Sequence, residues 1–412
     1  MHLELPHFEL PFFTNLLILL VSARFFGEIF ERFKQPAMIG EIIAGIFLGP
    51  SLLNLIHRTE EIKVISELGV FLLVILAGLE INIDDILKSL RGRNLLISIM
   101  AFFLPILCGF GVGYMFGQEA MTTVFIGLCV AITALPVSIR ILMDLGKINS
   151  EVGQKIISVA IFDDVLALTV LGVLLNIKDT DMSMAVILQV TAISLLKLIG
   201  FIIILSFSYL MIKRVSLKGN YFEEYLNRFL LFLKGKEPLF ALFFAFVLLF
   251  ATVTESLGFH FIIGAFFASM LISSTVIGED NLKNIESTTS SIAMGFLAPI
   301  FFAGIGLEFN ISSIENIGLL VAVVLVSYLS KIVGGYLGGK MAGLDRRFSL
   351  LMGIGLNARG IMELVIANIA YKAGLINLEV FSILVIMGVL TTLTTPLMLR
   401  RGFRKLDMAA AG

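Results

Sequence analysis

Long apolar stretches separated by short polar joins run through the whole chain. A helix of roughly 20 apolar residues spans the hydrocarbon core of a bilayer, which is about 30 Å thick. Helices also satisfy their own backbone hydrogen bonds, as lipid requires. The pattern therefore predicts an all-α polytopic membrane protein. Its thirteen predicted transmembrane helices lie near residues 12–31, 36–56, 62–81, 94–116, 121–143, 153–175, 184–213, 238–256, 258–276, 291–309, 317–341, 348–371 and 378–399.

The composition agrees with this prediction. The 412 residues are 58% hydrophobic and only 15% charged, and the mean hydropathy is +1.01, which excludes an ordinary soluble domain. We expect residues 1–400 to form a single transporter membrane domain. Residues 401–412 are expected to be a short cytoplasmic tail, with no soluble regulatory domain. Cys108 and Cys129 show no metal or disulfide spacing, and we expect no cofactor.

Basic residues in the joins predict the orientation of the chain. If the N-terminus lies outside, the joins on the cytoplasmic side carry 21 Lys and Arg residues and the outer joins carry 4. Cytoplasmic loops of membrane proteins are enriched in Lys and Arg. We therefore expect a multi-pass protein of the cell (inner) membrane, with its N-terminus outside and its C-terminus in the cytoplasm.

The two halves of the chain resemble each other. "ILAGLEINI" (75–83) returns as "FAGIGLEFNI" (302–311), and "MIGEIIAGIFLGPSLL" (38–53) corresponds to "IIGAFFASMLISSTVI" (262–277). Corresponding helices are seven spans apart, so the halves have opposite orientations in the membrane. This predicts two inverted-topology six-helix repeats, as in secondary transporters. The repeats cover about 12–175 and 238–399, and a linker helix at about 184–213 joins them.

Two corresponding spans carry signals for helix breaks. The fifth span contains Pro136, which removes a backbone donor and disfavours helix at the preceding residue. The twelfth span has glycines around Asn357 and Arg359. In inverted-repeat transporters, broken helices hold the ion site at the midplane, so the Thr133 hydroxyl and the freed carbonyls are candidate ion contacts. Arg359 and Glu363 are four residues apart, which predicts a local pair that supports the broken helix.

The sixth span carries two adjacent carboxylates, Asp163 and Asp164, in an apolar run. A carboxylate at the midplane costs on the order of 3 kcal/mol, and the corresponding span of the second half has Val389 and Leu390 there. The scaffold therefore does not require these acids, and a cation or proton site does. Lys331, central in the eleventh span, would be costly alone and is expected to pair with an aspartate. That pair is either a structural salt bridge or part of the proton path.

Several motifs together resemble monovalent cation:proton antiporters of the NapA/Kef type and the related plant cation/proton exchangers. The resemblance covers nearly the whole chain and rests on "IGEIIAGIFLGPSLL", "LAGLEINI", "AITALPVSIRIL", "FDDVLAL", "PIFFAGIGLEFNI" and "LNARGIMELVIANIA". It implies an NhaA/NapA-like fold with broken helices crossing in the core, a homodimer and elevator-type alternating access. It also implies that Asp164 is the main ion-binding carboxylate and that Asp163 pairs with Lys331.

Two departures from the family pattern bear on the substrate. Kef-type potassium exporters usually have glutamine before the aspartate and a C-terminal nucleotide-binding domain, and the plant exchangers usually have asparagine before it. The double aspartate here resembles the electrogenic sodium/proton members. The expected function is therefore exchange of Na⁺, or Li⁺, for H⁺, at Asp164, Asp163 and Thr133, in the service of pH homeostasis. A K⁺/H⁺ antiporter and a sodium-coupled organic-solute symporter remain alternatives.

Overall fold

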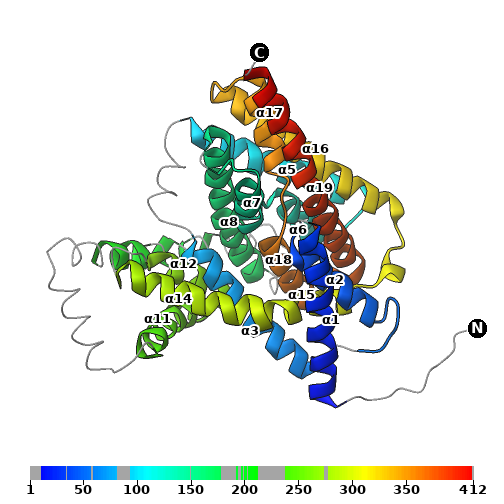
Figure 1. The fold of residues 1–412 in the computed structure, drawn as a ribbon, viewed down its shortest axis with the longest axis vertical. Helices are drawn as coiled ribbons and strands as arrows, with labels where there is room; N and C mark the ends of the chain where they lie inside the picture. Colours follow the sequence, from blue (N-terminus) through cyan, green and yellow to red (C-terminus); the bar gives the residue numbers. More distant parts are fainter. Residues whose placement is uncertain are drawn as a thin grey trace, which may run out of the picture. The chain divides into compact units, whose positions relative to one another are not determined.

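The computed structural model describes residues 11–33, 35–56, 59–80, 93–148, 150–177, 192–193, 196–197, 199–201, 203–211, 237–272 and 277–410. These residues form helices joined by turns, and no strand occurs among them. The helices are α1 (Phe12–Arg32), α2 (Ala37–Leu48), α3 (Glu60–Leu79), α5 (Asn94–Met115), α6 (Ala120–Ala131), α7 (Leu135–Asp144), α8 (Glu151–Ile177), α11 (Glu237–Ser256), α12 (Phe261–Leu271), α14 (Glu279–Ile292), α15 (Ala298–Glu308), α16 (Ile317–Met341), α17 (Arg346–Gly355), α18 (Ile361–Lys372) and α19 (Leu378–Ala410) (Figure 1).

Within the described part of the chain, eight helices are long and apolar enough to cross a membrane. They start at Phe12, Glu60, Leu95, Glu151, Glu237, Glu279, Ile317 and Leu378. The chain is therefore an all-helical membrane protein. Of the linker helix predicted at 184–213, residues 184–191, 194–195, 198, 202 and 212–213 lie outside the described residues, so the count of thirteen stays a prediction.

Several predicted boundaries differ from the structure: the span predicted over 291–309 belongs to a helix that starts at Glu279, and the span predicted over 258–276 is helical over Phe261–Leu271. The span predicted over 36–56 is helical only over Ala37–Leu48, because Pro50 disfavours helix at the residue before it. The tail predicted over 401–412 is helical as far as Ala410, as a continuation of α19. The sequence of residues 401–410, "RGFRKLDMAA", is rich in Arg, Lys, Leu, Met and Ala, which are all good helix formers.

The long helix 279–308 contains one turn of π-helix, Ala293–Leu297, between α14 and α15. The N–H of Ala298 bonds the carbonyl of Ala293, five residues earlier. Pro299 follows at the start of α15. Proline lacks the N–H of a regular helix and collides with the turn before it, and a π turn is one way for a helix to absorb that irregularity.

The contacts divide the chain into two compact units, Met1–Val70 with Ser291–Ser313, and Phe71–Ser290 with Ile314–Gly412. In the first unit, α2 packs closely on α15 through glycines. A Cβ atom on Gly45 would lie 2.0 Å from the carbonyl oxygen of Ala303, and one on Gly306 would lie 2.2 Å from that of Ile42. Small residues let membrane helices approach to this distance.

In the second unit, α16 packs against α5 and α17 in the same way. A Cβ atom on Gly334 would lie 2.7 Å from the carbonyl oxygen of Met100, and one on Gly338 would lie 2.7 Å from the Cα atom of Ile97. Gly335 faces Gly353 of α17, where the corresponding distance to Cα is 2.6 Å. This tight packing brings the middle of α16 against both α5 and the broken twelfth span.

We predict that Gly45→Val lowers the thermal unfolding midpoint of the detergent-solubilised chain by several degrees. The added side chain has no space against α15, and overpacking of this kind costs about 1–3 kcal/mol. Gly111→Ala on α5 is the matched control, because a Cβ atom there meets nothing within 4 Å. Equal midpoints for the two variants would contradict the packing argument.

Candidate functional site

Two helices of the second unit break, and their breaks are bonded to each other. α6 ends at Ala131 and α7 begins at Leu135, with extended backbone at Ile132 and Ala134. α17 ends at Gly355 and α18 begins at Ile361. The N–H of Ala134 donates to the carbonyl of Ala358 at 2.8 Å. The two interruptions thus satisfy part of each other's exposed backbone.

The first break follows from the sequence around Pro136. This proline lies in the first turn of α7, where its missing N–H would have no helical partner in any case. Leu135, directly before the proline, is already the first residue of α7, so the expected loss of helix at that residue does not occur. The extended residues Ile132 and Ala134 lie just ahead of the helix. Pro136 therefore lies in the first turn of the second half of the broken helix, which Leu135 begins.

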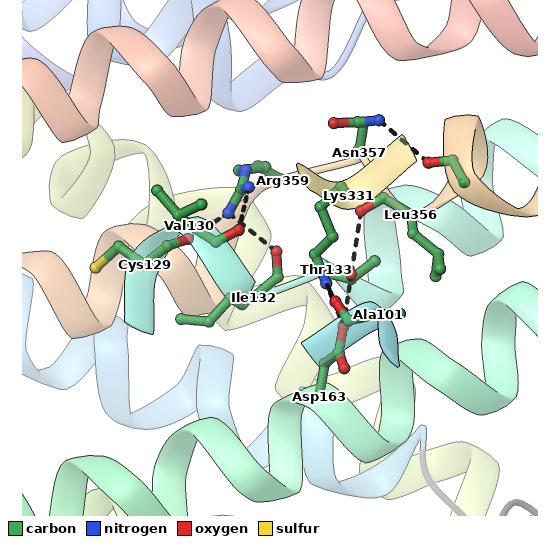
Figure 2. A network of polar contacts seen from close by, with 11 residues as sticks. Ala101, Cys129, Val130, Ile132, Thr133, Asp163, Lys331, Leu356, Asn357 and Arg359 are labelled. Atoms are coloured by element: carbon green, nitrogen blue, oxygen red, sulfur yellow. Dashed lines mark hydrogen bonds and ion pairs between the residues drawn. The ribbon is translucent and has the colours of Figure 1, made fainter. Parts of the chain in front are cut away.

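Arg359 lies in the second break and reaches across to the first. Its Nη1 atom donates to the carbonyls of Cys129 and Ile132, the latter at 3.1 Å, and its Nη2 atom donates to the carbonyl of Val130 (Figure 2). The last carbonyls of a helix have no partner within it and carry partial negative charge. The guanidinium therefore caps the carboxyl end of α6, and Thr392 of α19 donates to the carbonyl of Arg359 itself at 2.7 Å.

The structure shows no direct hydrogen bond between Arg359 and Glu363, the predicted local pair. Both carboxylate oxygens of Glu363 are buried without a hydrogen-bond partner among the described residues, as is Nε of Arg359. The reason is that Arg359 precedes α18, which begins at Ile361, so the helical spacing of four residues does not apply. Asn357 behaves as a local support, since its Nδ2 atom donates to the carbonyl of Gly353 in the last turn of α17 at 3.1 Å.

Asp163 of α8 is the centre of a small buried network. Its Oδ2 atom lies 2.7 Å from Nζ of Lys331 and 2.7 Å from the hydroxyl of Thr133 (Figure 2). The Thr133 hydroxyl is also 3.1 Å from the carbonyl oxygen of Leu356 in the second break. All three side chains are fully buried. The network therefore joins α8 and α16 to both broken helices.

Asp164 takes no part in this network. It has no exposed surface, and neither carboxylate oxygen has a hydrogen-bond partner in the described part of the chain. Adjacent residues of an α-helix project about 100° apart, so the two aspartates address different neighbours. Burying a carboxylate without partners costs free energy. Such a cost is expected where the carboxylate binds a proton or an ion.

Lys331 makes a second contact that the sequence reasoning missed. Its Nζ atom donates to the carbonyl of Ala101 in the middle of α5 at 3.0 Å. An interior helix carbonyl normally accepts from the N–H four residues later, and here that residue is Pro105, which has none. Pro105 was the feature of the sequence that could have indicated a free carbonyl at Ala101.

The buried charges of this region do not balance. Asp163, Asp164, Lys331, Arg359 and Glu363 all have no exposed surface. With every group ionised, three carboxylates face two cations, which leaves one negative charge in an apolar interior. Net buried charge is costly, so one bound monovalent cation or one proton restores neutrality.

The family-level comparison decides what kind of protein holds this site. The sequence pattern of the family described as "Sodium/hydrogen exchanger, transmembrane" matches residues 16–403. The chain belongs to the sodium/hydrogen exchanger family. This family consists of transporters rather than enzymes, and the chain is a transmembrane antiporter.

Two bacterial relatives are similar over almost their full length, and the chain spans about half the length of a plant relative. The Na(+)/H(+)-K(+) antiporter GerN of Bacillus cereus is 30% identical over 406 residues, covering 97% of this chain and 98% of the relative. The Na(+)/H(+) antiporter of Enterococcus hirae is 28% identical over 395 residues, covering 95% and 98%. Cation/H(+) antiporter 15 of Arabidopsis thaliana is 27% identical over 411 residues, covering 95% of this chain and 48% of the relative.

A solved structure shows the same fold. The sodium proton antiporter MjNhaP1 from Methanocaldococcus jannaschii superposes with a TM-score of 0.69, covering 96% of this chain and 97% of that one. The two sequences are only 16% identical, so the likeness concerns the fold.

We predict that Arg359→Gln lowers the thermal midpoint of the family member described here by several degrees. The substitution leaves buried carbonyls of α6 without a donor, and each such loss costs about 1–3 kcal/mol. The thermal midpoint of Arg359→Lys should fall between those of the wild type and Arg359→Gln, since an ammonium lacks the planar fork that reaches several acceptors. Arg347→Gln, at an exposed position of α17, is the matched control. A midpoint for Arg359→Gln equal to that of Arg347→Gln would show that the cap contributes nothing.

Proposed function

We propose that this chain is a secondary active antiporter that exchanges Na⁺ for H⁺ across the cell (inner) membrane, and that Asp164 is the exchange site. The observation that carries the proposal is the Asp164 carboxylate, fully buried and without a hydrogen-bond partner among the described residues, next to the network at the two breaks. Na⁺, and Li⁺ in the same way, prefers oxygen ligands. Thr133 and the freed carbonyl of Leu356 are further oxygens of this region.

Exchange follows from competition for one carboxylate. Asp164 holds either a proton or a monovalent cation, and each neutralises the Asp164 carboxylate. An empty carboxylate is costly to carry through apolar surroundings, so the empty form is the one that does not cross. Cation and proton then move in opposite directions without a separate coupling device.

The rest of the proposed mechanism concerns how the site reaches both sides. We propose elevator-type alternating access in a homodimer, with a moving core around the crossed breaks and a static dimerisation domain. The arrangement would rest on thirteen spans in two inverted repeats, with the N-terminus outside and the C-terminus in the cytoplasm. The role proposed for such exchange is monovalent cation transport in pH homeostasis.

Asp163 and Lys331 bear on whether transport carries charge. The two side chains are 2.7 Å apart and fully buried. If the ammonium gives up a proton when a cation binds, two protons exchange for one cation. One net charge moved across the membrane then couples transport to voltage by about 2.3 kcal/mol per 100 mV. We propose that exchange is electrogenic in this way, and an inert bridge would make it one-for-one.

K⁺ is a second candidate cation. The relative with 30% identity is named a Na(+)/H(+)-K(+) antiporter, and it matches this chain over nearly its full length. Replacing Na⁺ by Li⁺ or K⁺ in the proteoliposome assay described next distinguishes the substrates.

We predict that Asp164→Asn abolishes sodium-driven proton flux in proteoliposomes and leaves the thermal midpoint close to that of the wild type. The amide cannot exchange a proton and lacks the charge that binds a cation. Asp280→Asn, the same change at an exposed position of α14, should keep wild-type flux. Robust sodium-driven flux from Asp164→Asn would refute the assignment of the site.

We predict that Asp163→Asn removes most of the voltage dependence of exchange, measured as current on a solid-supported membrane. Without its counter-charge the Lys331 ammonium is costly to bury, so the side chain no longer alternates between charged and neutral forms. Thr133→Val removes the hydroxyl bond to Asp163 but keeps the ion pair, so it should retain the voltage dependence. Unchanged currents in Asp163→Asn would show that the bridge is only structural.

A further inference from the structure

The contact between Lys331 and α5 is built from both helices. On α5, Pro105 leaves the carbonyl of Ala101 without the N–H that would bond it in a regular helix. On α16, Gly334 lies one turn after Lys331, and a Cβ atom there would lie 2.7 Å from the carbonyl oxygen of Met100. The glycine lets the two backbones approach, and the proline supplies an acceptor at the point of approach.

This acceptor differs from the other partner of Lys331 in one chemical respect. The Asp163 carboxylate changes its charge when it binds a proton or a cation, whereas the backbone carbonyl of Ala101 does not titrate. A lysine side chain keeps two N–H donors after it loses a proton. The carbonyl can therefore hold the nitrogen in both protonation states.

We propose that Pro105 is a positioning residue: by freeing the Ala101 carbonyl it tethers Lys331 to α5 while the bond to Asp163 is made and broken. The inference rests on the proposed function, in which Asp163 and Lys331 take part in exchange. Pro105 itself touches neither substrate, and its effect reaches the site only through Ala101 and Lys331.

Charged groups surround Lys331 on the side of α8 and the breaks, whereas the contact with α5 is uncharged. Asp163 contacts it from α8 at 2.7 Å, Asp164 is the next residue of α8, and the Arg359 guanidinium lies at the crossed breaks. α5 contributes no charged side chain to this contact, only the carbonyl at 3.0 Å. Because this carbonyl favours the ammonium over the neutral amine, weakening it should ease proton release from Lys331.

The test is Pro105→Ala in the full chain, reconstituted in proteoliposomes and assayed for sodium-driven proton flux across a pH series. The new N–H of residue 105 competes with Lys331 for the Ala101 carbonyl. We expect the alkaline limb of the pH profile to move to lower pH by about half a unit to one unit, since a hydrogen bond to a charged group changes an equilibrium by roughly tenfold. We also expect fewer charges to move per cation.

Pro396→Ala is the matched control, because Pro396 is also inside a long helix of the same unit, α19, and lies outside the network of Lys331. Both variants gain a backbone donor and a better helix former, so both should fold with thermal midpoints at or above the wild type. Pro105→Val, which adds the same N–H with a different side chain, should reproduce the shift.

The outcomes separate the inference from the proposed function. If the wild type shows no cation/proton exchange while it is folded, the proposed function fails. If the wild type exchanges and Pro105→Ala has the same pH profile and the same charge per cation as Pro396→Ala, the proline is a structural kink and the inference is wrong. A shift confined to the two Pro105 variants, at unchanged thermal midpoint, supports the tether.

Discussion

Every polar group released inside this protein needs a partner inside it, because lipid supplies none. The two helix breaks leave carbonyls and N–H groups without helical partners in the apolar interior. These groups find partners because the two breaks lie against each other. Ala134 donates to Ala358 from one break to the other. Arg359 then caps carbonyls at the end of α6. The arrangement of the site therefore follows from the need to give the backbone groups of the two breaks hydrogen-bond partners, before any ion is considered.

Asp163 and Asp164 lie on α8, a helix without a break and therefore without released backbone groups. α8 is continuous through Asp163 and Asp164, so its backbone is satisfied and its side chains are free to differ in role. Asp163 joins the network that ties α8 to α16 and to both breaks. Asp164, one residue later, has no partner in the described part of the chain. One carboxylate held by an ion pair thus stands next to one without a partner, and this difference in surroundings gives the two aspartates different roles in the proposed exchange.

Sequence reasoning reached the parts of this arrangement that depend on local chemistry. Pro136 indicates the first break because a residue without an N–H fits the first turn of a helix and not its interior. The buried aspartates stand out because charge is costly in any apolar stretch. The partner of Arg359 could not be found in the same way. Spacing along the chain suggested Glu363, whereas the actual acceptors, Cys129, Val130 and Ile132, lie some 230 residues earlier. Only the crossing of the two breaks brings them within reach.

The two buried cations, Lys331 and Arg359, share a principle that separates them from the carboxylates. Both donate to carbonyls that ordinary helical bonding has given up, one opposite Pro105 in α5 and the others at the end of α6. Carbonyl oxygens keep the same charge at every pH, so they hold these side chains in place whatever the carboxylates are binding. The carboxylates and Lys331 can then take up and release protons and cations while the side chains of Lys331 and Arg359 keep their positions. Pro105 removes one hydrogen bond from α5 and so leaves the Ala101 carbonyl free to accept from the buried Lys331.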